Sequence, residues 1–262
     1  MRVSVNVETD DAPAPTWRGR LSSWAGNARR VALDLFYPPT CLACAAAVSE
    51  NGALCGKCWR EMRFIERPFC DRLGTPFPHD MGEGVLSQRA VDDPPVFQRA
   101  RAVACFEDGP ARRLVHRLKY SDRMELARPM GAWMARVGAD ILAEADALAP
   151  TPLHFTRAWR RQFNQAAALA GEVSRACGKP SETALLERVK PTRSQVGLNR
   201  AQRAANMQGA FRCPPTARLS GRRIVLVDDV LTSGATANAA SRALLRGGAK
   251  SVDVLVFARV AN

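Results

Sequence analysis

The chain has 262 residues, which is enough to bury a substantial core in one large domain or in a medium domain with a smaller one beside it. It contains no apolar run of about 18 residues that could cross a membrane, and its N-terminus lacks the apolar core of a secretory signal. We therefore expect a cytoplasmic protein without a membrane span.

The formal net charge of +13 is unevenly distributed along the chain. Residues 154–223 contain fourteen Lys and Arg against three Glu, an excess of eleven positive charges in 70 residues. Such a field favours a polyanionic partner, either a pyrophosphate substrate or a nucleic-acid backbone. A basic, solvated surface with no specific partner is the alternative.

The first 36 residues are expected to lie outside the folded domains as a tail and one helix. Residues 1–18 are polar, contain proline and have no periodicity, which is typical of disorder. Apolar side chains then recur at helical spacing from Leu21 to Leu35. This pattern predicts an amphipathic helix that packs against the next module rather than against a membrane.

Two Cys-x-x-Cys pairs follow, Cys41 with Cys44 and Cys55 with Cys58, separated by ten residues. Each pair can present two thiolates from a tight turn, so the two pairs complete a tetrahedral sulfur site that suits zinc. Four protein ligands leave no open position, so the zinc is expected to be structural. Reduced structural cysteines are the alternative, while disulfides would require an oxidising compartment.

The zinc module is expected to span residues 37–77, with Cys70 alone in its second half because Leu73 stands where a partner would be needed. Residues 78–95 are rich in Gly, Pro, Asp and Ser, which predicts a linker. A larger domain should occupy residues 96–262.

Strands alternate with helices in this larger domain, which indicates a mostly parallel sheet of the α/β class, flanked by helices. The expected helices cover residues 109–119, 125–142, 163–176 and 235–246. The expected strands cover residues 101–106, 148–152, 184–189, 210–213, 224–227 and 252–258.

The most informative stretch runs from Arg223 to Thr236. An apolar run, Ile224 to Val227, reads as a buried parallel strand, so Asp228 and Asp229 should lie just past its carboxyl end, where open α/β sheets bind ligands. A hydroxyl and glycine loop then leads into a helix, and a helix N-terminus attracts phosphate. The alternative is a capped helix behind a solvated acidic turn.

Two polar, basic segments precede that stretch. Residues 151–165 link a strand end to a helix, and residues 190–206 are poor in packing side chains. We interpret the second segment as a hood over a ligand, with contact to nucleic acid as the competing interpretation.

The run VLVDDVLTSGAT resembles the phosphoribosyl pyrophosphate (PRPP) signature of type I phosphoribosyltransferases. The resemblance implies that Asp228 and Asp229 are catalytic and bind the ribose hydroxyls, with Mg²⁺ accompanying PRPP. It implies a 5-phosphate site at Thr232, Ser233, Gly234, Ala235 and Thr236. It implies a pyrophosphate loop at Thr151, Pro152, Leu153, His154, Arg157, Arg161, Asn164 and Gln165. The flexible hood would carry Arg193, Gln195, Arg200, Arg203 and Asn206.

The four-cysteine ribbon, the PTPLH and RRQFNQ stretches, the QVGLNRAQRAANMQGAF segment and VLVDDVLTSGAT together resemble the ComF family over residues 35–260. Members of this competence-associated family join a double zinc ribbon to a type I phosphoribosyltransferase-like domain. Here the second ribbon is degenerate, so one zinc site is expected. The family's cellular role implies DNA uptake in natural transformation or nucleotide metabolism, alongside competence and helicase proteins.

Two functions remain open at this point. One is a phosphoribosyltransferase-like protein that binds PRPP or a ribose 5-phosphate nucleotide and is an Mg²⁺-dependent glycosyltransferase if it turns over. The other is a non-catalytic competence factor that binds single-stranded DNA with the same fold. Aromatic residues are scarce in the basic segment, which limits base stacking there.

Overall fold

The structure is a computed structural model that describes residues 38–120, 124–153, 164–190 and 199–260. The tail and amphipathic helix expected in residues 1–36 lie outside the described residues. The chain divides into two units, Met1–Pro39 and Thr40–Asn262, and the second unit holds the described helices and strands. Among the described residues, no helix combines the length and the apolar content that a membrane crossing requires.

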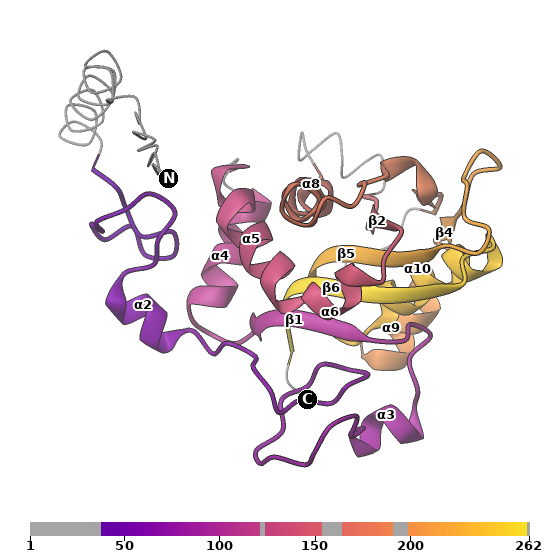
Figure 1. Ribbon diagram of the computed structural model, residues 1–262, viewed down its shortest axis with the longest axis horizontal. Helices are drawn as coiled ribbons and strands as arrows, with labels where there is room; N and C mark the ends of the chain where they lie inside the picture. Colours follow the sequence, from indigo (N-terminus) through magenta and orange to yellow (C-terminus); the bar gives the residue numbers. More distant parts are fainter. Residues whose placement is uncertain (1–37, 121–123, 154–163, 191–198, 261–262) are drawn as a thin grey trace, which may run out of the picture. The chain divides into compact units, whose positions relative to one another are not determined.

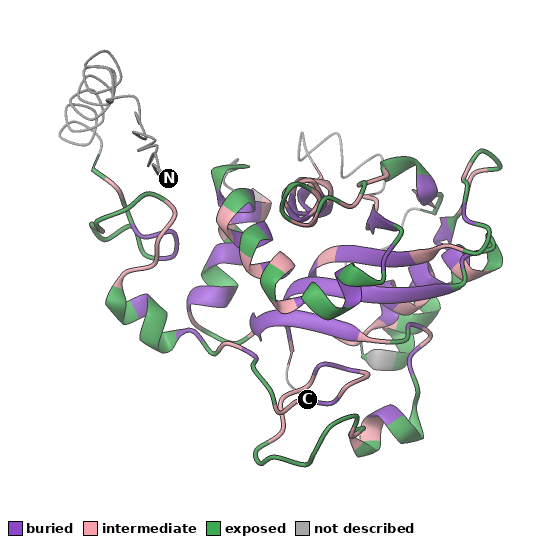
Figure 2. Cartoon of the chain, in the orientation of Figure 1, coloured by how far each residue is buried: buried purple, intermediate pink, exposed green. Residues whose placement is uncertain are grey.

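A four-stranded parallel sheet forms the centre of the larger domain (Figure 1). Its order is β1 (Ala100–Cys105), β6 (Ser251–Arg259), β5 (Arg223–Leu231) and β2 (Ala147–Pro150). These strands are apolar and buried over most of their length, as expected when both faces of a parallel sheet are covered (Figure 2). The expected α/β class is confirmed.

Helices cover both faces of the sheet (Figure 1). On one face, α4 (Pro110–Tyr120), α5 (Ala127–Val137) and α8 (Gln165–Cys177) share a core with Leu255 and Phe257 of β6. On the other face, α10 (Ala235–Arg246) and α9 (Arg200–Met207) share a second core with Val254 and Val256. Successive side chains of β6 therefore point to opposite faces of the sheet and pack in two separate cores.

The prediction of one continuous helix over residues 125–142 is wrong. It is divided into the 3-10 turn η1 (Met124–Leu126), α5 and the short α6 (Ala139–Ala143). Gly138 separates α5 from α6, and a Cβ at this position would come within 2.8 Å of the Leu255 side chain. The break lets the chain approach β6 closely. The helical periodicity of the sequence gives no sign of this close approach.

The strand expected over residues 184–189 is also only partly present. Its first half is the 3-10 turn η2 (Thr183–Leu185), and only β3 (Glu187–Arg188) is extended. It pairs antiparallel with β4 (Phe211–Arg212) in a separate two-stranded sheet. An exposed ion pair between Arg212 and Glu187 links these two strands.

The first ribbon contains a metal-knuckle turn and a short helix, α2 (Gly56–Glu61). The Cys41 N–H donates to Ala46, Thr40 bridges to Ala47, and Ala45 adopts a left-handed φ of 63°. The Cys55 thiol caps α2 by accepting from the Cys58 N–H. These turns place the four thiols of the two Cys-x-x-Cys pairs near one another.

The same backbone pattern recurs around Cys70, although the other three cysteines of a ribbon are missing there. The Cys70 N–H donates to Thr75, Phe69 bridges to Pro76, and Gly74 has a φ of 64°. A Cβ on Gly74 would lie 2.5 Å from the Ala100 carbonyl oxygen, which explains why glycine stands here. The second ribbon is thus present as a fold.

A second short helix, α3 (Gln88–Asp92), completes this repeat and lies inside the segment expected as a linker. Ser87 caps α3 by accepting from the Ala90 N–H, as Cys55 caps α2. The four ligand positions of the second ribbon are therefore occupied by Cys70, Leu73, Ser87 and Ala90. The remaining domain boundaries stay predictions.

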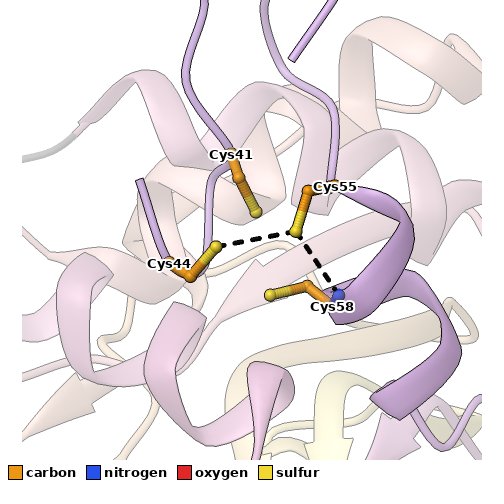
Figure 3. A group of neighbouring side chains, drawn as sticks. All are labelled: Cys41, Cys44, Cys55 and Cys58. Carbon is orange, nitrogen blue, oxygen red and sulfur yellow. Dashed lines mark hydrogen bonds between the residues drawn. The ribbon is translucent and has the colours of Figure 1, made fainter. Parts of the chain in front are cut away.

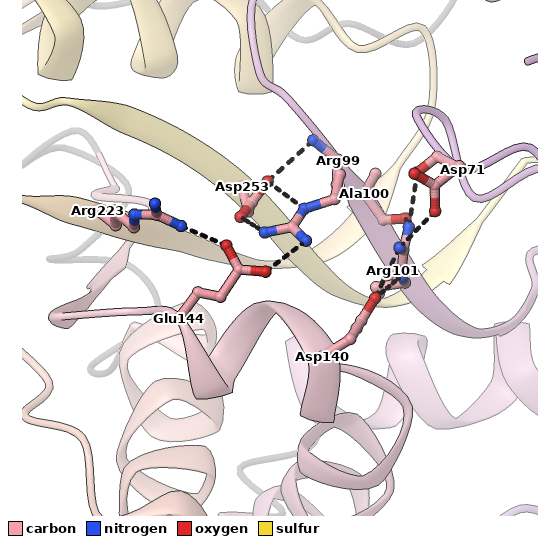
Figure 4. A network of polar contacts seen from close by, with 8 residues as sticks. All are labelled: Asp71, Arg99, Ala100, Arg101, Asp140, Glu144, Arg223 and Asp253. Carbon is pink, nitrogen blue, oxygen red and sulfur yellow. Dashed lines mark hydrogen bonds and ion pairs between the residues drawn. The ribbon is translucent and has the colours of Figure 1, made fainter. Parts of the chain in front are cut away.

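Ion pairs join the ribbon segment and the sheet (Figure 4). Arg101 of β1, only 3% exposed, is paired with Asp71 at 2.9 Å and with Asp140 of α6 at 2.7 Å. Nearby, Arg99 pairs with Asp253 and Glu144, both at 2.9 Å. A buried cation with two carboxylate partners holds the second ribbon and α6 in register on β1.

Candidate functional site

Four thiols form the metal centre of the first ribbon (Figure 3). The sulfur atoms of Cys41, Cys44, Cys55 and Cys58 all lie within 4.8 Å of one another, and Cys44 and Cys55 are 3.6 Å apart. Tetrahedral zinc with Zn–S bonds of about 2.3 Å needs sulfur atoms about 3.8 Å apart. The donor set fits structural zinc, as the spacing predicted, and it leaves no position for substrate.

The surroundings of this centre favour the thiolate at Cys41 and disfavour it at Cys58, where burial raises the pKa to about 12. Burial acts to raise the pKa of Cys41, but hydrogen bonds from the backbone N–H groups of Cys55, Cys44 and Ala43 outweigh it and lower the pKa to about 6. Arg113 of α4 lies 3.6 Å from the Cys58 sulfur, and Arg117 of the same helix donates to the Leu42 carbonyl. Helix α4 therefore supports the ribbon through two arginines.

The acidic pair lies within β5, not past its end as expected. Strand β5 continues to Leu231 because residues 228–231 remain aligned with β6. The neighbouring β2 stops at Pro150, which pairs with Val227. Asp228 and Asp229 therefore lie beyond the last paired residue of β2, and β5 itself is longer than expected.

A lysine from α4 completes the acidic pair. The Lys119 ammonium nitrogen lies 2.9 Å from Oδ2 of Asp229, and the Asp229 N–H donates to Oδ1 of Asp228 at 2.8 Å. Desolvation, followed by the charge of Asp229, raises the pKa of Asp228 to about 7, against the opposing effects of the Asp229 N–H and of Lys119. Asp228 can therefore gain or lose its proton near neutral pH.

The loop between β5 and α10 has the backbone that an anion site needs. Gly234 caps α10 in the left-handed region, with φ 80°, and the Ala235 N–H lies 3.5 Å from the Ser233 hydroxyl. Thr232, Ser233 and Gly234 are partly exposed, and the helix begins at Ala235 as predicted. The N–H groups at this end of α10 can bind a phosphate. The assignment of a ligand to residues 232–236 stays a prediction.

The expected pyrophosphate loop is only partly described. Thr151 is buried close to Asp228, and its N–H donates to the Val227 carbonyl, which fixes the loop start beside the acidic pair. Pro152 and Leu153 are half-buried beyond it. His154, Arg157 and Arg161 lie outside the described residues.

The two polar residues at the other end of this loop have structural contacts. Asn164 caps α8 by accepting from the Ala166 N–H, and its amide nitrogen donates to the Thr151 carbonyl at 3.1 Å. Gln165 is buried and its amide nitrogen is 3.5 Å from the Lys119 carbonyl oxygen. These contacts close the loop and bring the ends of α4 and α8 together beside the acidic pair.

The expected hood differs from its prediction where it is described. Arg200, Arg203 and Asn206 lie on helix α9, which Asn199 and Gln202 start with a reciprocal capping box. Met207 at the end of α9 is buried in the core shared with α10. The sequence did not predict this helix, because only one of its faces packs and the segment is therefore mostly polar. Arg193 and Gln195 lie outside the described residues.

Comparison with known proteins matches both parts of the chain. Residues 32–89 match the double zinc ribbon domain, and residues 164–262 match the phosphoribosyl transferase domain. The DNA utilization protein YhgH of Escherichia coli K12 is 31% identical over 232 residues, covering 86% of this chain and 99% of that protein. Competence protein F of Haemophilus influenzae is 27% identical over 232 residues, covering 86% of this chain and 98% of that protein.

The chain belongs to the ComF family. Membership accounts for the repeated knuckle at Cys70, because a double zinc ribbon contains two such knuckles. The matched region, residues 32–89, includes both knuckles and Ser87 and ends next to Ala90. In this ComF-family chain the first ribbon keeps four cysteines, and the second keeps the backbone with one cysteine. The expected combination of a zinc ribbon with a phosphoribosyltransferase-like domain is confirmed.

One residue at the acidic pair of this ComF-family chain was not predicted from sequence. Lys119 was expected only as the end of a helix, since it is 110 positions from Asp229 and belongs to no local motif. Asn238 was not predicted to make a tertiary contact either. Its side-chain oxygen accepts a hydrogen bond from the Val96 N–H, which fixes residues near the ribbon against the first turn of α10. Contacts of such sequence separation leave no local pattern.

Proposed function

We propose that this chain binds PRPP or another ribose 5-phosphate nucleotide, together with Mg²⁺, at the acidic pair and the Thr232–Thr236 loop. The observation that carries the proposal is the overhang of Asp228 and Asp229 beyond β2, a few residues before the Gly234 cap of α10. Carboxylates suit ribose hydroxyls and Mg²⁺, and a helix N-terminus suits the 5-phosphate. Thr151 and the loop after it would face the pyrophosphate.

Each part of the proposed site has a distinct task. Asp228 and Asp229 would accept hydrogen bonds from the ribose hydroxyls, with Lys119 holding Asp229 in place. Bound Mg²⁺ would neutralise charge on the pyrophosphate. Departure of pyrophosphate from the ribose would depend mainly on positioning and on fixed positive charge. The chain has Thr232 where purine-salvage relatives of the type I group have a carboxylate, which speaks against that subgroup.

We further propose that the site serves DNA uptake in natural transformation or nucleotide metabolism linked to it. The support is the names of the relatives, DNA utilization protein and Competence protein F, whose length this chain spans almost completely. Competence and helicase proteins are the partners that such a role would require.

Calorimetric titration with PRPP and Mg²⁺ tests the ligand. Wild-type chain should bind, and a variant with Asp228→Asn and Asp229→Asn should lose most of the affinity. The double amide is a close match in size, so a change in fold is not expected from volume. Absence of binding to the wild type would refute the proposal.

A second candidate is a non-catalytic binder of single-stranded DNA, favoured by the excess of positive charge in residues 154–223. Part of this excess is offset by an acid outside the segment, because Arg223 pairs with Glu144. The affinity for single strands should fall with salt, with a slope of about −0.7 for each phosphate neutralised. A flat salt response would eliminate electrostatic binding of DNA.

A further inference from the structure

A cleft of about 570 Å³ lies beside β1, away from the acidic pair and the phosphate loop. It is bounded by the segment that leaves the first ribbon, by α5 and by α6. Its lining shares no residue with the proposed ribose 5-phosphate site. The side chains that distinguish it are aromatic and cationic: Trp59, Phe64, Phe69, Trp133, Arg67 and Arg136.

The aromatic rings form a continuous row from the surface to the core. Trp59 and Phe64 have ring centroids 4.8 Å apart, Phe64 meets Trp133 edge to face at 6.3 Å, and Trp133 stacks on Phe257 at 6.2 Å. Phe257 is fully buried, whereas Trp59 is 53% exposed. The row is therefore anchored at one end and offers ring faces to a ligand at the other. Tryptophan is enriched among the residues that contribute most to binding at interfaces.

Cations stand at the same cleft. Arg67 is exposed and packs its guanidinium 4.9 Å from the centre of the Phe69 ring. Arg136 is exposed on α5, and within the described residues neither arginine is paired with a carboxylate. Glu66, which precedes Arg67 in the chain, is an exposed acid of the same lining. These arginines can reach anionic groups of a ligand whose flat part lies on the rings.

The wall of the cleft also supplies an oriented acceptor. Both hydrogen bonds from Arg101 to Asp140 end on Oδ2, at 2.9 and 2.7 Å (Figure 4). Among the hydrogen bonds of the described residues, none ends on Oδ1 of Asp140, and the side chain is 40% exposed. Arg101 thus fixes a carboxylate that can accept an N–H at the edge of a planar ring. Every unpaired nucleobase carries such a donor on its Watson–Crick edge.

We infer that this aromatic cleft binds the bases of a single-stranded nucleic acid. Trp59 and Phe64 stack on a base, Asp140 accepts from its edge, and Arg67 and Arg136 contact the flanking phosphates. A base in a duplex has its edge donors occupied and its faces covered by neighbours, so the cleft selects single strands. The inference is independent of PRPP binding and deepens the DNA-binding candidate, since it places base contacts outside the basic segment.

Tryptophan fluorescence and anisotropy test the inference with a labelled oligothymidylate of about 15 nucleotides. Stacking is worth about 1–3 kcal/mol per base, so Trp59→Ala should weaken binding at least about fivefold and reduce the quenching. Trp59→Phe should retain most of the affinity because it keeps a ring. Arg136→Ala should weaken binding and reduce the salt slope by about 0.7.

Met124→Ala is the matched control, because Met124 is 54% exposed and does not line the cleft. It should bind as the wild type does, and thermal unfolding should confirm that Trp59→Ala remains folded. If the wild type binds and both Trp59→Ala and Arg136→Ala bind with the same affinity, the DNA does not bind in the cleft and the inference is overturned. No binding by the wild type, or equal binding of duplex, would overturn it as well. The variant with Asp228→Asn and Asp229→Asn should still bind the oligonucleotide, because the cleft does not include the acidic pair. Its result therefore distinguishes failure of the cleft from failure of the PRPP proposal.

Discussion

Lys119 Nζ lies 2.9 Å from Oδ2 of Asp229 and so ties the last turn of α4 to the acidic pair of β5. The same helix carries Arg113 against the Cys58 sulfur and Arg117 against the Leu42 carbonyl. One helix therefore contacts both the zinc ribbon and the proposed ribose 5-phosphate site.

Replacing Lys119 should weaken the proposed ligand site in a pH-dependent way. The ammonium lowers the pKa of Asp228, so Lys119→Met should raise that pKa and leave the pair more protonated at pH 7. We expect affinity for PRPP with Mg²⁺ to fall by about tenfold at pH 7, corresponding to about 1.4 kcal/mol, and to recover at higher pH. Calorimetry across pH measures this effect. Lys119→Arg keeps the charge and should bind nearly as tightly, whereas a pH-independent loss in Lys119→Met would contradict the electrostatic role.

Asp228 should make the unliganded protein less stable as the pH rises. Its pKa is raised from 3.8 to about 7, so the folded state holds the proton that the unfolded state releases. The stabilisation is complete below pH 4 for this group and is lost as the pH rises through about 7. Asp228→Asn should therefore increase the free energy of unfolding at pH 8 by at least about 1 kcal/mol.

Chemical denaturation at pH 5 and at pH 8 measures this difference. The gain from Asp228→Asn should be smaller at pH 5, where the wild-type carboxyl already holds its proton. Val91→Ala, an exposed apolar position on α3, is a control that should show no such pH dependence. An equal effect of Asp228→Asn at both pH values would show that burial does not raise the pKa of this carboxyl.

The sequence predicted elements whose signals are local and missed those that depend on distant partners. Helix α10 begins and ends where predicted, because the Gly234 cap and the apolar spacing lie within the element. The break at Gly138 depends on Leu255, and the extension of β5 through Asp228 depends on pairing with β6. The α9 helix was read as a loop since its single packed face includes only a few apolar residues.

The site shows the same division. The cysteine spacing predicted the cluster of four thiols, because two short turns generate it. Lys119 and the aromatic cleft could not be predicted, since Trp59, Phe64 and Trp133 are brought together only by the pairing of Phe64 with Ala104 and the packing of α5. Motifs identify sites whose residues are consecutive, and folded surfaces collected from separate elements require the structure.

The two ribbons should respond differently to the loss of a thiol. Cys44→Ser should remove the structural zinc, measured as a fall from about one metal ion per chain, and should loosen residues 40–62. Cys70→Ser should keep the zinc, because the Cys70 sulfur accepts N–H bonds from Leu73 and Ser87 in place of binding metal. Metal analysis of the two purified variants makes the comparison. Loss of zinc from Cys70→Ser would mean that the second ribbon shares the metal of the first.

The second ribbon keeps the geometry of a metal site without its ligands. Its knuckle repeats the first one in three backbone features: the Cys70 N–H to Thr75 bond, the Phe69 to Pro76 bridge and the left-handed Gly74. Burial acts to raise the pKa of Cys70, but hydrogen bonds involving Ser87 and nearby backbone N–H groups outweigh it and lower the pKa. The guanidinium of Arg259 also donates to the Leu73 carbonyl. Hydrogen bonds and apolar packing thus hold this ribbon in place of zinc.

Restoring the three missing ligands should restore a second metal site. A variant with Leu73→Cys, Ser87→Cys and Ala90→Cys places four thiols on the repeated backbone, and zinc content should rise to about two ions per chain. The lost apolar packing of Leu73 costs about 2–3 kcal/mol, less than the binding energy of about 10–16 kcal/mol that a structural zinc supplies. Ser87→Cys with Ala90→Cys alone keeps Leu73 in the core, so it should stay folded and bind the second ion more weakly. A folded triple variant that still holds only about one zinc would show that the two ribbons differ in backbone geometry after all.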